Sequence, residues 1–123
     1  ILFKMDTKTM TGYGLRLIRT TKYHDAIDCI IVKYDNNKVT EISKPVSTSC
    51  FRPTCNIKIE VTGGQITVQM DSPAQYHIIP DRPEVLTEVK MEVEAAGNEY
   101  GGFGILYSGG ATTMIDELKA EWK

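Results

Sequence analysis

Long apolar runs are missing from this sequence, and so is an excess of charge of either sign. No run of apolar residues approaches the roughly 18 that a membrane-spanning helix needs. The 14 Lys and Arg residues nearly balance the 16 Asp and Glu residues, which leaves a net charge of −2. A nucleic-acid-binding domain carries a basic stripe, and this mildly acidic chain has none. We therefore expect neither a membrane nor a nucleic acid as a partner.

The motifs of the common catalytic sites are also missing. His24 and Asp25 could supply two members of a catalytic triad, but no Gly-x-Ser-x-Gly elbow accompanies them. No glycine pair is followed by the Lys and Ser or Thr of a phosphate-binding loop. Glu88, Glu92 and Glu94 share one face of an alternating segment, where we expect solvation rather than acid–base chemistry. We do not expect an enzyme, and the alternative is an unrecognised carboxylate pair.

Cysteine is scarce, with three residues in the chain. Cys50 and Cys55 bracket a short loop that contains a proline, whereas Cys29 lies in an apolar run. The bracketing pair either closes a disulfide, which would indicate an oxidising compartment, or consists of small buried thiols. His24 and His77 lack the spacing to these cysteines that a structural zinc site requires. We assign no metal ligands and no cofactor, leave only calcium open, and take Cys50–Cys55 as the candidate disulfide.

The sequence instead consists of short alternating segments, each ended by Gly, Asn, Asp or Pro. Alternation of apolar and polar residues with a period of two is typical of strands with one buried face. The residues at 35–37 and 63–64 supply the turn chemistry that favours hairpins. Many short strands at this spacing predict a single β-sandwich or barrel domain over residues 1–123. The predicted strands are Ile1–Met5, Gly12–Arg19, Ile27–Tyr34, Val39–Ile42, Asn56–Val61, Gln65–Met70, Thr87–Val93, Gly102–Tyr107 and Thr113–Trp122.

Several segments leave alternatives open. Ile18 breaks the alternation of its strand, which predicts either a bulge there or a strand covered on both faces. Leu86–Glu94 could form an amphipathic helix, but its strict period of two favours a strand. Thr113–Trp122 is rich in good helix formers, and we prefer a strand because so many strands precede it. Ser43–Thr54 and Ser72–Pro83 are expected to be loops.

Five pieces of the sequence follow one another in the order of a known family. They are Gly12–Arg16, Cys29–Asn36, the hairpin of Asn56–Gly63 and Ile66–Asp71, Gly102–Tyr107, and Met114–Trp122. This order resembles the concanavalin A-like, laminin G-like jelly-roll family of bacterial carbohydrate-active proteins. The resemblance covers most of the chain and implies an all-β, two-sheet antiparallel jelly-roll sandwich. No residue matches a sugar-binding or calcium motif of that family.

The resemblance also implies a function. Members of the family usually have more sequence before the first glycine-rich strand, and this chain starts abruptly at Ile1, so we expect a fragment of a larger protein. We expect a lectin-like, non-catalytic carbohydrate-binding module, an accessory domain of a secreted or periplasmic polysaccharide-processing protein. Its partners would be a glycan and the remainder of the parent enzyme. The alternative is a structural β-sandwich domain that packs against a catalytic domain.

Arg and Tyr residues near strand ends are the best candidates for a ligand face. Arg can form forked hydrogen bonds to the carboxylates of acidic sugars, and aromatic rings can stack on sugar rings. From these residues we choose Arg16, Arg19, Tyr23 and Arg52 as the expected ligand-binding residues.

Overall fold

The computed structural model describes residues 1–19, 26–49, 55–62, 64–71, 88–94 and 102–104, and this part of the chain is all-β. Every regular element in these ranges is a strand, so they contain no helix that could cross a membrane. The strands are β1 (Leu2–Asp6), β2 (Thr11–Arg19), β3 (Ile27–Asp35), β4 (Lys38–Glu41), β5 (Val46–Thr48), β6 (Asn56–Thr62), β7 (Gln65–Asp71), β8 (Val89–Glu94) and β9 (Gly102–Gly104).

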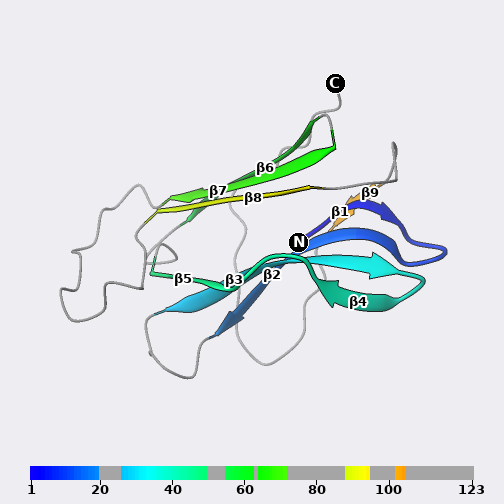
Figure 1. Cartoon of the computed structure of the whole chain (residues 1–123), viewed down its shortest axis with the longest axis horizontal. Coiled ribbons are helices and arrows are strands. Elements are labelled where there is room, and N and C mark those ends of the chain that lie inside the picture. Colours follow the sequence, from blue (N-terminus) through cyan, green and yellow to red (C-terminus); the bar gives the residue numbers. More distant parts are fainter. Residues whose placement is uncertain (20–25, 50–54, 63, 72–87, 95–101, 105–123) are drawn as a thin grey trace.

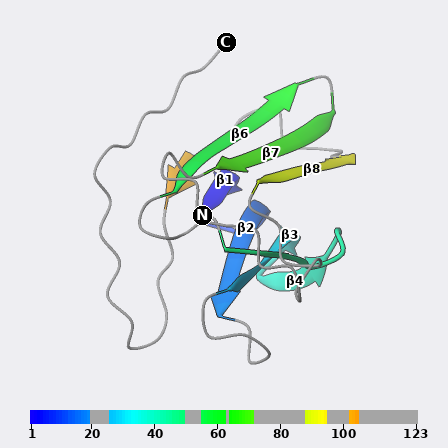
Figure 2. The same cartoon turned by 90° about the vertical axis from the view of Figure 1, so that its left-hand side faces the viewer.

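The strands form two antiparallel sheets that stack as the layers of a sandwich (Figure 1; Figure 2). The six-stranded sheet has the order β4-β3-β2-β1-β9. Its sixth strand, β5, pairs with the first part of β3, on the edge that β4 occupies further along. The three-stranded sheet has the order β6-β7-β8. The predicted all-β sandwich of two antiparallel sheets is therefore confirmed.

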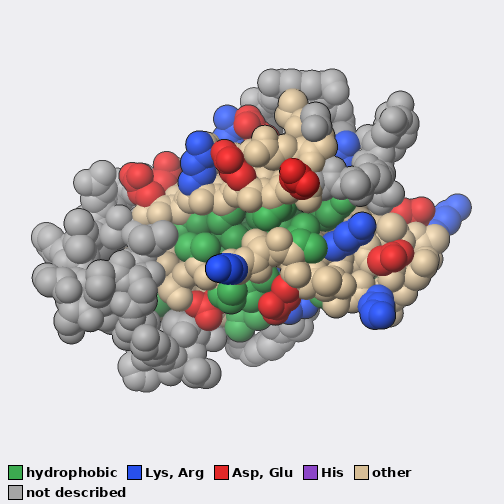
Figure 3. Space-filling view, viewed as in Figure 1, with side chains coloured by type: hydrophobic (Ala, Val, Ile, Leu, Met, Phe, Trp, Pro, Cys, Tyr) green, Lys and Arg blue, Asp and Glu red, His purple; other side chains and the backbone are tan. Residues whose placement is uncertain are grey.

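The core lies between the two sheets and is built by alternate residues of both. Fully burying an aliphatic side chain stabilises a fold by about 1.5–3 kcal/mol, so this layer supplies the main attraction between the sheets. At its centre the Cys29 thiol lies 3.6 Å from the sulfur of Met70, which joins β3 to β7. Figure 3 shows the layer as a band of hydrophobic side chains between the more polar surfaces. Its buried members are Phe3, Tyr13, Leu15, Cys29, Ile31, Ile66, Val68, Met70, Val89 and Met91.

A β-bulge shapes the pairing of β1 with β2. Phe3 opposes Tyr13 and Asp6 opposes Thr11, so Lys4 and Met5 together face the single residue Gly12. Lys4 has a φ of 52°, the left-handed backbone that lets one strand carry an extra residue. The carbonyl of Lys4 comes so close to Gly12 that a side chain there would lie 2.5 Å from its oxygen. Glycine is required at this position because the two backbones touch.

Both predicted hairpins are present. Asn36 and Asn37 have φ values of 48° and 68°, the left-handed pair that a two-residue hairpin turn requires and that Asn tolerates. This turn pairs Asp35 with Lys38 and fixes the register of β3 and β4. Gly64, with a φ of 79°, lies in the turn that pairs β6 with β7 over their full length.

Three expectations need correction. The predicted loop Ser43–Thr54 contains strand β5, which exists because its three residues pair with the start of β3 rather than because of its own sequence. Neither alternative for Ile18 is right, because β2 and β3 pair without a register shift and the Ile18 side chain is 42% exposed. The strand predicted over Thr87–Val93 runs from Val89 to Glu94, which excludes a helix there. The predicted strand Thr113–Trp122 lies outside the described residues.

Candidate functional site

The structure describes the side chain of one of the four expected ligand-binding residues. Arg16 lies in the middle of β2. Arg19 ends the same strand, and only its backbone is described. Tyr23 and Arg52 lie outside the described residues, so the grouping of the four stays a prediction. Cys50 also lies outside them, and the Cys50–Cys55 disulfide likewise stays a prediction.

Arg16 belongs to the face of the six-stranded sheet that points away from the core. Directly opposed residues of an antiparallel sheet project to the same face, and neighbours along a strand project to opposite faces. Cys29 and Ile31 of β3 lie in the core, so the alternate residues of β3 project to the other side, which we call the outer face. On β2 to β5 the register places there Gly14, Arg16, Ile18, Asp28, Ile30, Val32, Tyr34, Val39, Glu41 and Ser47.

An ion pair crosses β3 on the outer face. Arg16 of β2 opposes Ile30, and Glu41 of β4 opposes Val32, so the two charged side chains must meet above β3. Arg16 Nη1 lies 4.0 Å from Glu41 Oε1. Ile30 and Val32 are buried, although they point away from the core. The Arg16 side chain keeps 36% of its surface exposed.

An aromatic ring lies beside this ion pair. Tyr34 of β3 leans towards β2, where its Cε2 atom lies 3.2 Å from the position that a Cβ atom on Gly14 would occupy. The absence of a side chain at Gly14 leaves room for the ring to rest on the strand. The side chain combines a large apolar surface with a polar hydroxyl group at its tip. Tyr34 is half-buried.

The other end of the outer face carries a polar pair. The Ser47 hydroxyl donates a hydrogen bond of 2.5 Å to Asp28 Oδ1. Strand β5 brings Ser47 opposite Asp28, so the strand that sequence reasoning missed supplies part of this site. Asp28 in turn opposes the exposed Ile18 on β2. The outer face of β2 to β5 thus carries one cationic and two anionic side chains, with an aromatic ring at one end and exposed apolar groups at its margins.

Sequence reasoning singled out Arg16, whose role in binding stays a prediction, and did not single out the residues around it. Part of the signal was present, because the two-residue turn at Asn36 and Asn37 places Glu41 opposite Val32 once the turn type is known. The position of Tyr34 beside Gly14 depends on the register of β2 with β3. Their connection carries no comparable turn signal, so its sequence could not give that register.

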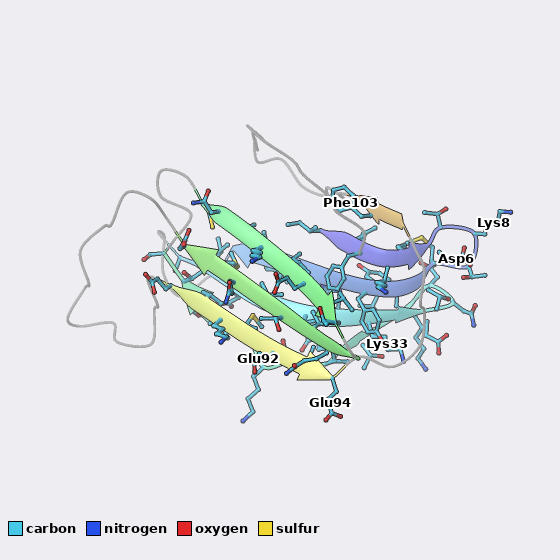
Figure 4. The ribbon with its side chains drawn as sticks, turned by 90° about the horizontal axis from the view of Figure 1, so that it is seen from above. Asp6, Lys8, Lys33, Glu92, Glu94 and Phe103 are labelled. Carbon is cyan, nitrogen blue, oxygen red and sulfur yellow. The ribbon has the colours of Figure 1, made fainter. Side chains whose placement is uncertain are left out.

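The outer side of the three-stranded sheet has a different chemistry. Its side chains are polar on all three strands, and ion pairs run along them: Lys58 Nζ lies 3.0 Å from Glu60 Oε1, and Lys90 Nζ lies 3.5 Å from Glu92 Oε1. Figure 4 labels Glu92 and Glu94 on β8, and both are exposed, as expected for a solvated face.

A metal site does not emerge from the side chains whose positions are described. Within them, no group of three or more His, Cys, Asp or Glu residues gathers closely enough to hold an ion. Asp28 and Glu41 share the outer face, but Asp28 accepts a hydrogen bond from Ser47 and Glu41 faces Arg16. The site therefore offers hydrogen-bonding groups and an aromatic surface. In comparisons with known proteins, no protein-family model, no curated protein and no solved structure matches the chain.

Proposed function

We propose that the chain is a non-catalytic carbohydrate-binding module of a larger polysaccharide-processing protein, with the glycan bound on the outer face of the six-stranded sheet. The observation that carries the proposal is the Tyr34 side chain, which reaches Gly14 with its Cε2 atom and shares the outer face with the Arg16–Glu41 pair. A jelly-roll topology of the concanavalin A-like type and a secreted or periplasmic location belong to the same proposal. They rest on the order of the strand segments in the sequence.

The chemistry of the outer face suits a sugar. A sugar ring has apolar C–H faces that pack on an aromatic ring, and hydroxyl groups at its rim that both donate and accept hydrogen bonds. Tyr34 would supply the aromatic surface. The Arg16 guanidinium can donate only, whereas ionised Asp28 and Glu41 can accept only. Donors and acceptors next to an aromatic platform are an arrangement that can orient a ligand on a largely apolar surface.

Substitution of Tyr34 tests the proposal. Tyr34→Ala should lower the affinity for the bound glycan about tenfold, because it removes an aromatic contact worth roughly 1.5 kcal/mol. Phe103→Ala is the matched control, since Phe103 is an exposed aromatic residue whose neighbours Gly102 and Gly104 place it on the opposite side of the sheet (Figure 4). The binding partner is first found on a glycan array, with and without calcium, and affinities are then measured by titration calorimetry.

Two results would contradict the proposal. One is a folded wild-type chain that binds no glycan on the array. The other is an equal loss of affinity in both variants, which would place the ligand elsewhere. Thermal unfolding of each variant shows that the comparison is made between folded proteins.

A second function has support from one observation. Ile18 and Val39 are 42% and 41% exposed and lie on the outer face, on either side of the charged groups. Exposed apolar residues around Tyr and Arg are typical of protein interfaces, which fits a structural domain packed against a catalytic domain. In that case the double variant Ile18→Ser, Val39→Ser should lose binding to the remainder of the parent protein. If this function is wrong, the variant retains that binding.

A further inference from the structure

The balance of charge on the outer face bears on the kind of ligand it accepts. On β2 to β5, the described charged side chains of this face are Arg16, Asp28 and Glu41. One positive and two negative groups leave a net negative charge. A free arginine on an apolar surface would attract carboxylates and sulfates. Here Arg16, the described cation of this face on β2 to β5, already has an anion beside it.

The Arg16–Glu41 contact leaves most of the guanidinium free to bind. Its closest approach is a single Nη1–Oε1 distance of 4.0 Å, which is too long for the paired hydrogen bonds of a bidentate contact. The Arg16 and Glu41 side chains are 36% and 54% exposed, so both can reach a ligand. Hydroxyl groups can accept from Arg16 and donate to Glu41 at once, whereas a carboxylate ligand would meet Glu41 as a like charge.

The polar groups also lie in a line. Three features follow one another along β3: Tyr34, then the Arg16–Glu41 ion pair above Val32 and Ile30, and then Asp28. At about 3.3 Å per residue, the stretch from residue 34 to residue 28 is about 20 Å long. That length suits an extended chain of several sugar rings better than a single sugar.

We propose that Glu41 is a specificity-determining residue that restricts the outer face to uncharged glycan chains lying along β3. This inference rests on the proposed carbohydrate-binding function. Glu41 acts by compensating the charge of Arg16 and by repelling ligand carboxylates, while its own oxygens accept hydrogen bonds from ligand hydroxyls. The ligand class is thus a neutral polysaccharide, and uronic-acid polymers are excluded.

Affinity electrophoresis of the whole chain tests this assignment. The gels contain either a neutral polysaccharide (a glucan, xylan or mannan) or an acidic one (polygalacturonate or alginate). The wild-type chain should be retarded by a neutral polymer only. Glu41→Gln should bind the acidic polymers at least about fivefold more tightly than the wild type, because one like charge next to the ligand is gone. The gain should shrink as salt is added.

Glu94→Gln is the matched control. It removes the same charge from an exposed residue on the other sheet, so its binding to both classes of polymer should equal that of the wild type. If the loss of any carboxylate increased acidic-polymer binding equally, the effect would come from net charge and the role of Glu41 would be refuted.

The outcomes separate this inference from the function on which it rests. Wild-type binding to acidic polymers that Tyr34→Ala weakens would overturn the neutral class and leave the carbohydrate-binding face in place. A Glu41→Gln variant that gains no acidic binding would overturn the role of Glu41. A folded wild-type chain that no polymer of either class retards would overturn the carbohydrate-binding function itself.

Discussion

Replacement of Gly12 by alanine is expected to destabilise the six-stranded sheet strongly. The new Cβ atom would lie 2.5 Å from the Lys4 carbonyl oxygen and 2.7 Å from Met5 Cα, and contacts below 3.0 Å essentially never occur for real Cβ atoms. Both neighbours are backbone, so no side chain can swing aside, and β1 would have to move by about half an ångström. Overpacking that forces backbone shifts costs about 1–3 kcal/mol and occasionally more. Because all three of the nearest atoms are backbone, we expect a loss of about 2–4 kcal/mol.

Urea and thermal unfolding of the whole chain measure this loss. For a domain of this length, a loss of that size lowers the Tm by roughly 8–15 °C. Gly104→Ala is the control, because a Cβ atom on Gly104 would have nothing within 4 Å. Its free energy of unfolding should change by no more than about 0.5 kcal/mol. If Gly12→Ala unfolded at the same urea concentration as the wild type, with the same m-value, the close approach of β1 and β2 at the bulge would be refuted.

Two further substitutions test the hairpin and the core. Asn37 has a φ of 68°, so Asn37→Val should lower the stability by about 1–2 kcal/mol. Asn37→Gly should be neutral or stabilising, because glycine adopts this backbone readily. Equal Tm values for the two variants would contradict the turn geometry. Ile31 is fully buried between the sheets, so Ile31→Ala should cost about 2–5 kcal/mol by urea unfolding. Val39→Ala, at an exposed position, should change the free energy of unfolding by about 0.5 kcal/mol or less. If Ile31→Ala cost as little as Val39→Ala, the placement of Ile31 in the core would be contradicted.

The parts of the fold that follow from local chemistry could be predicted from the sequence. The Asn36–Asn37 turn and the hairpin of β6 and β7 are set by residues next to one another in the chain, because turn type fixes register. Strand β5 could not be predicted in this way. It has three residues, follows Pro45, and is a strand only because β3 offers it a pairing edge.

The candidate site shows the same division. Arg16 was chosen as a basic residue near a strand end, and the structure places it in the middle of β2 instead. Glu41 and Tyr34 come to lie near Arg16 through the register of β2 with β3, which no local signal determines. A site spread over the face of a sheet is therefore harder to recognise from sequence than one carried by a single motif.

The pairing of β1 with β9 has a consequence for the time at which the sheet can be completed. Strands β1 to β5 come from the first 48 residues, and the chain can pair them in sequence through short connections. Leu2, however, opposes Gly104, so one edge of β1 waits until almost the whole described chain has been made. Closing so long a loop is entropically costly and slow. During synthesis, β1 is therefore an open sheet edge, the kind of edge at which growing chains pair with one another, and β9 protects it last.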